Sequence, residues 1–318
     1  MKFTKILSLL IGLVSSNLIF CQESLPFYQQ YLISDKVLIN PSFTGSTDDW
    51  VFKATFNKHW GNFDGGPNTQ TLSTHVNLVD RVGVGMYFFR DENGAATLNG
   101  ANISAAYHIP IGDEEDRENQ FSFGPSISLF NQSICRACLR PDDPNDASLD
   151  ENLNVFLPYL NLGVNAKYKG IFGGVSVLDI PLGNNKEIVN TQEPLPTWYY
   201  FNLGYNWNFA ENLYLEPSFL MNINTNSERQ LDSNLKAKYK DDDNAFAVGV
   251  SYRQDLDENG QQALMLSPII QAEMGRLNFG FAYTLGLSDI SRQGGNGFVI
   301  SLGYNVENIL NTRGFRYR

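Results

Sequence analysis

Two cysteines, Cys135 and Cys138, form a Cys-Arg-Ala-Cys motif within a long stretch that has no strand periodicity. A zinc site would need two more ligands, and none of the three histidines stands beside a second cysteine pair. A redox role would need a thioredoxin-like unit around the motif, which is absent. A small structural disulfide between the two cysteines, formed in an oxidising compartment, is therefore the prediction. The histidines are His59, His75 and His108.

A second candidate lies at Asp255–Gly260, which matches the first half of a calcium loop, D-x-D-x-N-G. The twelfth position is Leu266, where such a loop needs a bidentate Glu, and the flanking segments have the period of strands. The sequence therefore predicts a polar hairpin here. The acidic run 142–151 is interpreted as a solvated loop, with a cation site as the alternative.

Gly83-Val84-Gly85 looks like the start of a dinucleotide motif, but no third glycine follows and the segment alternates as a strand does. These glycines are interpreted as relieving crowding inside a barrel, the architecture that the rest of the chain predicts. No motif brings together a nucleophile, a base and an orienting group. The sequence predicts neither an enzyme nor a cofactor.

The stretch Leu277–Leu287 alternates strictly between large apolar residues and small or polar ones. The solvent face of a soluble strand usually carries Lys, Glu or Arg rather than Gly and Ala. The pattern fits a strand whose large side chains meet lipid and whose small side chains face a crowded lumen. The predicted lipid-facing residues are Phe279 and Phe281, and the predicted lumen-facing residues are Gly280 and Ala282.

Similar alternation recurs along the chain in about fourteen segments, many of them near the ten residues that a tilted strand needs to cross a bilayer. The predicted fold is all-β: a transmembrane antiparallel β-barrel of about 14 strands. After the first 21 residues no run of about 18 apolar residues exists, so only a closed barrel could span a membrane. The segments are Trp50–Asn57, Gln70–Asn77, Val82–Phe89, Leu98–His108, Phe121–Phe130, Phe156–Lys169, Ile171–Val177, Trp198–Trp207, Leu213–Asn222, Gln230–Lys240, Phe246–Arg253, Gln262–Met274, Leu277–Leu287 and Gly297–Asn305.

The connections between these segments fall into two alternating sets. One set consists mostly of tight turns, such as Lys169–Gly170 and Gly275–Arg276, with the longer acidic connection Ile109–Asn119 as an exception. The other set includes the long connections Asn131–Val155 and Leu178–Pro196. Short turns on one rim and long loops on the other are typical of outer-membrane barrels, in which the short turns are periplasmic.

The charge balance excludes some partners, since 23 Lys and Arg against 34 Asp and Glu give a net charge of −11. Such a chain is not expected to bind nucleic acid or anionic lipid surfaces. At the N-terminus, Lys2 and Lys5 precede an apolar run, which predicts a signal peptide over residues 1–21 that is cleaved after Cys21. Lipidation of Cys21 is the alternative, but it needs a small residue where Phe20 stands.

Three further parts complete the predicted organisation. Residues 22–49 are a periplasmic lead-in that could tuck into the barrel mouth, residues 50–305 form the outer-membrane barrel, and residues 306–318 are a C-terminal tail. Aromatic residues near segment ends are predicted to form girdles at the membrane interfaces. They include Trp50, Trp60, Trp198, Tyr199 and Trp207.

The lumen-facing positions are mostly Gly, Ser, Asn, Thr and Ala, with few charges. A porin keeps charged residues around a water-filled lumen, so this composition favours a narrow or plugged interior. The predicted inward charges are Lys53, Glu216, Lys236, Lys238 and Arg253.

Two stretches near the start of the chain carry a family resemblance. Gln30-Tyr31 with the segment Ile39–Ser46 resembles a "QY … NPAYAGS" signature, and His59–Thr69 resembles "QWxGFDGAPxT". Both signatures are those of the PorP/SprF family of Bacteroidota outer-membrane proteins. The departures, which include His59 for Gln, leave the subgroup open. The matching positions are Gln30, Tyr31, Asn40, Pro41, Gly45, Trp60, Gly61, Phe63, Asp64, Gly65 and Pro67.

The resemblance implies a fourteen-stranded outer-membrane barrel that serves type IX secretion or gliding motility. Some members resemble core secretion components, and others accompany a large surface protein, such as an adhesin, which they help to export or hold at the cell surface. The implied partners are outer-membrane lipid, the secreted protein and type IX secretion components. Composition and spacing do not show that role, and the alternative is an outer-membrane channel or transporter for small solutes.

Overall fold

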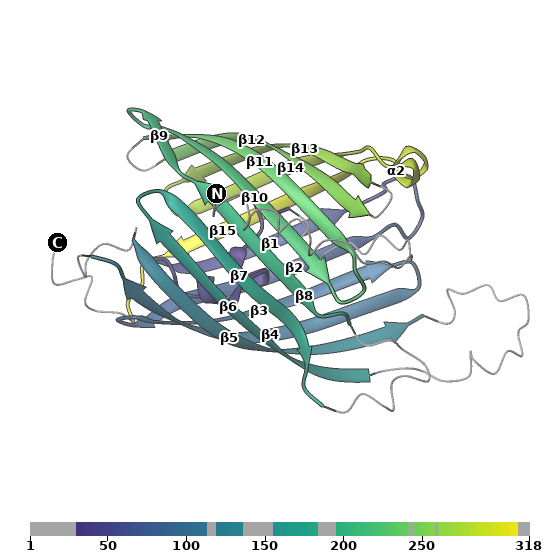
Figure 1. Cartoon of the computed structure of the whole chain (residues 1–318), viewed down its shortest axis with the longest axis horizontal. Coiled ribbons are helices and arrows are strands. Elements are labelled where there is room, and N and C mark those ends of the chain that lie inside the picture. Colours follow the sequence, from purple (N-terminus) through teal and green to yellow (C-terminus); the bar gives the residue numbers. More distant parts are fainter. Residues whose placement is uncertain are drawn as a thin grey trace, which may run out of the picture.

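Alternating side chains give the strands of this chain two different faces. The chain closes into a barrel, so that one face of each strand points outward and the other points into the lumen (Figure 1). The computed structural model describes residues 30–112, 119–135, 155–183, 195–241, 244–257 and 260–310. The first strand, β1 (Trp50–Lys58), pairs with the second, β2 (Asn68–Val79), and with the last, β15 (Gly297–Val306). Because these pairings close the sheet, no strand edge is left to meet hydrocarbon.

All pairs of neighbouring strands are antiparallel, and each predicted segment overlaps a strand of the structure. A break at Asn206 separates β8 from β9, and both pair with β10, so the barrel has fourteen strands around its wall. The remaining strands are β3 (Val82–Asn93), β4 (Ala96–Pro110), β5 (Gln120–Ile134), β6 (Val155–Tyr168), β7 (Ile171–Pro181), β8 (Trp198–Tyr205), β9 (Trp207–Ala210), β10 (Leu213–Asn224), β11 (Arg229–Asp241), β12 (Asn244–Asp257), β13 (Gly260–Met274) and β14 (Leu277–Gly286).

The predicted facing of the strands is confirmed. In β14, Phe279 and Tyr283 are exposed on the outer surface, whereas Gly280 and Ala282 are buried toward the lumen. The same alternation produces an outer belt of large apolar side chains on most strands, which is the surface that contacts lipid. The belt includes Leu72, Phe88, Ile103, Ile127, Leu203, Phe219, Val248, Ile270 and Leu302.

The two rims differ as predicted, with one exception on the outer side. Tight turns at Asp80–Arg81, Lys169–Gly170 and Gly275–Arg276 lie on the periplasmic rim. On the outer rim the connection from β3 to β4 is also tight, because Gly94 has a φ of 59° and turns the chain directly back. The longer connection from β14 to β15 on this rim carries the short helix α2 (Asp289–Gly294). Within the described ranges, no helix is long and apolar enough to cross a membrane.

The prediction that Trp198 belongs to the aromatic girdle at the membrane interface is wrong. Trp198 begins β8 at the outer rim, but its side chain points into the barrel and is 8% exposed. Its neighbour Tyr199 and the more distant Trp207 are exposed, as a girdle requires. Since alternate residues of a strand point to opposite faces, two adjacent aromatic residues cannot both face lipid.

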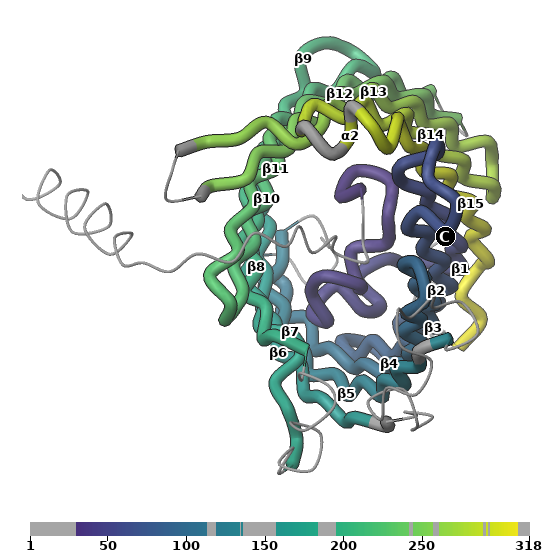
Figure 2. Tube along the Cα trace, turned by 90° about the vertical axis from the view of Figure 1, so that its right-hand side faces the viewer, coloured from purple at the N-terminus to yellow at the C-terminus, as the bar shows by residue number. Residues whose placement is uncertain are grey.

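The N-terminal segment fills the middle of the lumen (Figure 2). Residues 30–45, here called the plug, form two short 3₁₀ helices, η1 (Lys36–Leu38) and η2 (Pro41–Phe43). Every plug residue except Lys36 is buried, and Ile33, Leu38 and Ile39 are no more than 2% exposed. Residues 30–45 of the expected lead-in therefore lie inside the barrel, deeper than its mouth. A plugged interior, which the lumen composition favoured, is what the structure has.

Candidate functional site: the plug and the outer rim

The plug holds its own shape through side chains that cap its short helices. Asp35 precedes η1, and its Oδ1 accepts the N–H of Val37 at 3.2 Å. Asn40 precedes η2, and its Oδ1 accepts the N–H of Ser42 at 3.0 Å. Asp and Asn are favoured at such positions because their short side chains reach the otherwise unpaired N–H groups. The plug thus has a defined shape against which the barrel wall can pack.

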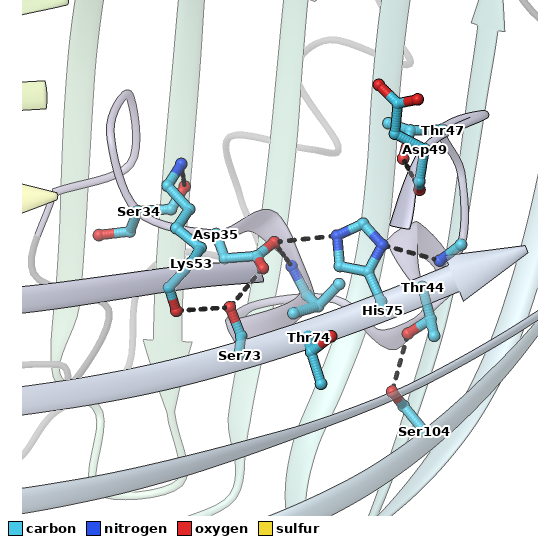
Figure 3. Close-up of polar contacts among 12 residues, drawn as sticks. Ser34, Asp35, Thr44, Thr47, Asp49, Lys53, Ser73, Thr74, His75 and Ser104 are labelled. Atoms are coloured by element: carbon cyan, nitrogen blue, oxygen red, sulfur yellow. Dashed lines mark hydrogen bonds and ion pairs between the residues drawn. The ribbon is translucent and has the colours of Figure 1, made fainter. Parts of the chain in front are cut away.

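The first attachment of the plug to the wall is centred on Asp35 (Figure 3). Ser73 of β2 donates its hydroxyl to Asp35 Oδ2 at 2.5 Å, and His75 Nε2 lies 3.7 Å from Asp35 Oδ1. The other ring nitrogen of His75, Nδ1, accepts the backbone N–H of Gly45 at 3.2 Å. Because Nδ1 accepts, the proton of a neutral His75 is on Nε2 and faces the carboxylate. One histidine therefore connects the residue that caps η1 with the last residue of the plug.

The second attachment is a close backbone approach at the end of the plug. A Cβ on Gly83 of β3 would lie 2.0 Å from the carbonyl oxygen of Thr44, and one on Gly45 would lie 2.4 Å from the Cα of Gly83. The predicted role of Gly83 in relieving crowding is confirmed. His108 of β4 approaches the same carbonyl, with its Nε2 2.9 Å from Thr44 O, and Thr44 Oγ1 donates to Ser104 Oγ at 2.9 Å.

The third attachment joins the middle of the plug to β6 and β7. The Asn40 side chain donates to the carbonyl oxygens of Val164 and Val175, at 3.0 and 3.4 Å. Asn165 donates to Ser42 Oγ at 2.7 Å. A Cβ on Gly163 would lie 2.0 Å from Asn40 Oδ1, so only glycine fits here. Asn40 both caps η2 and reaches the wall, which gives this residue of the family signature a physical role.

The one half-buried residue of the plug, Lys36, is surrounded by aromatic rings. Its Nζ lies 5.4 Å from the ring centre of Tyr31, 5.8 Å from that of Phe43 and 5.0 Å from that of Phe172. Cations are attracted to the faces of such rings within about 6 Å. Phe172 belongs to β7, so this contact also fixes the plug to the wall. At the start of the plug, Gln271 of β13 donates to Leu32 O at 2.8 Å.

Each predicted inward charge has a partner inside the barrel. Lys53 donates to the carbonyl oxygen of Ser34 in the plug at 3.4 Å. The other four predicted charges form ion pairs along the wall from β10 to β13. The pairs are Lys236–Glu216 at 3.0 Å, Lys238–Glu273 at 2.8 Å and Arg253–Asp232 at 2.6 Å. Asp232 and Glu273 were not predicted. Asp232 lies directly opposite Arg253 on the neighbouring strand, which is a usable signal. Glu273 lies two strands away from Lys238, with β12 between them, so it gives no such signal.

The other family-signature residues lie on the outer rim, in the connection 59–67 from β1 to β2. Its backbone pairs with the end of α2 and the residues after it, through Gly61 N to Asn296 O at 3.0 Å and Asn62 N to Gly294 O at 2.9 Å. Gly65 O accepts the N–H of Gly94 at 3.0 Å. Three connections are thus joined into one lip. The plug ends beside Gly83, near the periplasmic rim. The signature residues in the plug therefore lie apart from those in the connection 59–67 on the outer rim.

The three histidines do not form a catalytic group. His59, the first residue of the connection 59–67 in the lip, is buried, and burial together with the nearby charge of Arg253 lowers its pKa to about 3. His75 and His108 are occupied with the plug, as described above. Within the described ranges, no three His, Cys, Asp or Glu residues come together as a metal site. What the arrangement does is hold a polypeptide segment in the lumen.

Three other predicted features lie partly or wholly outside the described residues. Asp257 pairs with Gly260 in a hairpin between β12 and β13, which confirms the hairpin predicted there, although residues 258–259 are not described. The acidic run 142–151 and the signal-peptide residues 1–21 also lie outside the described residues.

Cys135 is disulfide-bonded, and Cys138 lies outside the described residues, so their pairing stays a prediction. We expect the non-reduced mature protein to weigh two protons less than the reduced form, because each cysteine has one partner within reach after signal cleavage. Intact-mass spectrometry with and without a reducing agent checks this. Two freely alkylated thiols in the non-reduced protein would contradict it.

Comparison with solved structures finds similar barrels of low sequence identity. The TodX monoaromatic hydrocarbon channel deltaS2 mutant has 11% identity and a TM-score of 0.50, over 88% of this chain and 95% of that chain. The toluene transporter TbuX of Ralstonia pickettii has 10% identity and a TM-score of 0.51, over 86% and 93%. A Pseudomonas aeruginosa FadL homologue has 12% identity and a TM-score of 0.50, over 92% and 100%.

These likenesses support the fold alone, because identity is so low. A comparison with curated proteins finds no match. The family comparison is more specific, since residues 20–304 match the type IX secretion system membrane protein PorP/SprF. That range includes both groups of signature residues and almost the whole barrel. The chain therefore belongs to the PorP/SprF family of type IX secretion system membrane proteins and is a β-barrel of the outer membrane.

Proposed function

We propose that this barrel has no catalytic role and helps to export, or to hold at the cell surface, a large partner protein such as an adhesin. The observation that carries the proposal is the plug. Residues 30–45 are fixed to the wall by Asp35, Asn40 and Thr44, which hydrogen-bond to residues of β2, β4, β6 and β7. A lumen filled in this way suits a barrel that presents surfaces to other proteins.

The charges of the lumen support the same interpretation. In a solute channel, charged side chains face the permeating molecule and the water around it. Here Arg253 and Asp232 are each 2% exposed and engage one another, and Lys53 is used to hold the plug. These charges stabilise the interior of the barrel instead of lining an open path.

The outer rim offers a place for the partner. The lip formed by residues 59–67, Gly94 and the connection after α2 is held by backbone hydrogen bonds, so it is a rigid base. The longest connections, 135–154 and 182–197, leave the same rim. Loops that a rigid scaffold positions are common binding elements. We expect the partner to be held by these two connections above the lip.

The test is affinity purification of the tagged barrel from native membranes. It should recover one large surface protein, and deletion of the gene should remove that protein from the cell surface while general secretion continues. Replacing both long connections by tight turns should release the partner and leave the barrel folded. The matched control shortens the periplasmic connection 111–119, which should keep the partner. Full recovery of the partner with both outer connections shortened would exclude them as its binding site.

A solute channel is the second candidate, since the solved barrels similar to this one include a hydrocarbon channel and a toluene transporter. Part of the inner wall is also apolar, since the aromatic side chains of Phe89, Phe130 and Tyr159 are buried inside the barrel and contact one another. The two functions differ in whether the lumen conducts with the plug in place. The first prediction of the Discussion measures this.

A further inference from the structure

β9 is the periplasmic end of the wall strand that begins with β8, and it runs past the neighbouring turn between β6 and β7. The last pair between β8 and β7 is Tyr205 with Ile171. The next residue, Asn206, donates its N–H to Gly170 O in that turn at 2.7 Å. Beyond this point β9 pairs with β10 alone and projects from the ring of strands (Figure 2). In the part of the chain that the structure describes, no strand covers the other edge of Trp207–Ala210.

The backbone groups of Asn208 point toward this open edge. The register of β8 and β9 against β10 is unbroken from Gly204 to Asn208. Along an antiparallel strand, alternate residues direct their N–H and C=O groups to the same side. Because Asn206 donates toward the turn between β6 and β7, Asn208 has both of its backbone groups on that side, where no described residue hydrogen-bonds to them. The bulge between β9 and β10 comes later, at Leu213 and Tyr214, so it leaves Asn208 in regular geometry.

Other strands that run past a neighbour on this rim have a protected edge. In β4, His108 donates its N–H to Arg81 O at 2.8 Å, and the next residue with the same direction is Pro110, which has no N–H. In the part of β2 that extends past β1, Asn77 O accepts the side-chain N–H of Asn308 at 2.7 Å. Such devices keep a strand edge from pairing with another chain. Among the described residues, β9 has neither a proline nor a covering side chain.

The ribbon of β9 and the start of β10 also carries aromatic rings that a partner can reach. Trp207 is 46% exposed and Phe209 is 60% exposed, and their ring centres lie 5.4 Å apart, edge to face. Asn208 and Ala210 are exposed as well, so both faces of β9 stand clear of the barrel wall. A strand added beside β9 would therefore meet hydrogen-bonding groups along the edge and aromatic rings for its own apolar side chains.

We propose that β9 is a docking edge for an extended segment of a periplasmic protein, which adds as a strand in line with β7. The open edge fixes the class of occupant, because its backbone groups pair in a ladder only with an extended chain. The added strand would continue the β7–β8 pairing, which runs antiparallel from Leu178 and Trp198 to Ile171 and Tyr205. This site lies on the rim opposite the outer connections, so the proposal does not depend on how the surface partner is held.

The test uses the full barrel in lipid nanodiscs and a labelled, capped peptide of sequence Thr-Val-Thr-Tyr-Thr-Val, measured by fluorescence anisotropy. The comparison peptide has the same side chains but an N-methyl group on every residue. Wild type should bind the first peptide about tenfold more tightly or better, because two backbone hydrogen bonds at Asn208 contribute about that much. Asn208→Pro should remove the preference, since it deletes the N–H that faces the open edge. The matched control, Asn208→Ala, keeps the backbone and should keep the preference.

Heat-modifiable migration on gels confirms that both variants fold, and the two peptides can be compared on wild type without any variant. Equal affinity of wild type for the two peptides, or binding of neither, would overturn the proposal. So would an unchanged preference in folded Asn208→Pro. Mass photometry of the peptide-free barrel tests a second copy as the occupant. A dimer that Asn208→Pro separates and Asn208→Ala does not would assign the edge to self-association and also contradict the proposal.

Discussion

Deleting residues 30–45 is expected to turn a closed barrel into a conducting pore. The wall is complete without the plug, because β1 pairs directly with β15 and every strand has two neighbours. The space that the plug leaves is lined by polar side chains that now hydrogen-bond to it, such as Ser73, Ser104 and Asn165. Water and ions should therefore replace the plug in the lumen.

The measurement is single-channel recording in planar lipid bilayers. Wild type should show no large steady current, and the deletion variant should show one in most insertions. A milder variant is Gly163→Val, whose Cβ would lie 2.0 Å from Asn40 Oδ1 and should displace the middle of the plug. Gly303→Ala is its control, because that Cβ would meet only wall residues such as Asn278, at 3.1 Å.

Heat-modifiable migration on gels confirms that each variant still folds. Large steady currents from wild type would contradict the partner-holding function and favour the solute channel. If the folded deletion variant conducts no better than wild type, the plug is not what closes the lumen. In that case the closure must come from elsewhere in the barrel, with the outer connections as the next candidates.

The wall of the barrel could be predicted from the sequence because it depends on local alternation. Phe279 and Ala282 face opposite sides because odd and even positions of a strand point to opposite faces. This period of two can be recognised in the sequence without a structure. The tight turn at Gly275–Arg276 is equally local. Strand ends were less predictable, since β5 continues to Ile134, beyond the predicted end at Phe130.

The plug and its attachments could not be predicted in this way. The segment has neither a helical nor a strand period, and its path is set by distant partners such as the carbonyls of Val164 and Val175 for Asn40. The family signature marked Asn40 and Gly45 without giving a reason for them. The structure supplies the reason for each: a cap that reaches the wall, and a backbone that passes within contact of Gly83.

The aromatic residues at the start of β8 show a different limit. Periodicity tells which residues share a face, but Trp198 and Tyr199 are both aromatic, so composition alone did not say which of them faces lipid. The bulge at Asp179 is an irregularity of pairing between β6 and β7, and it shifts the facing of the residues that follow. Neither feature leaves a signal in a single strand. Both arise from the register between strands.

The second prediction concerns the buried ion pair on the inner wall, which should contribute far more to stability than a similar exposed pair. Arg253 and Asp232 lie opposite one another on β12 and β11, and two hydrogen bonds of 2.6 and 2.8 Å join them. Both side chains are 2% exposed. Asp232→Ala should therefore lower the free energy of unfolding by about 3 to 5 kcal/mol, because it leaves a buried guanidinium without its carboxylate.

The matched control is Glu273→Ala, which breaks the pair with Lys238 on the same wall. These side chains are 46% and 30% exposed, so water screens the pair and its loss should cost about 0 to 1 kcal/mol. Urea titration of each barrel folded into phosphatidylcholine vesicles, followed by tryptophan fluorescence, measures both changes. The double variant Asp232→Ala, Arg253→Met should recover much of the loss, since it removes the unpaired charge. Equal losses in Asp232→Ala and Glu273→Ala would mean that burial does not set the strength of these pairs.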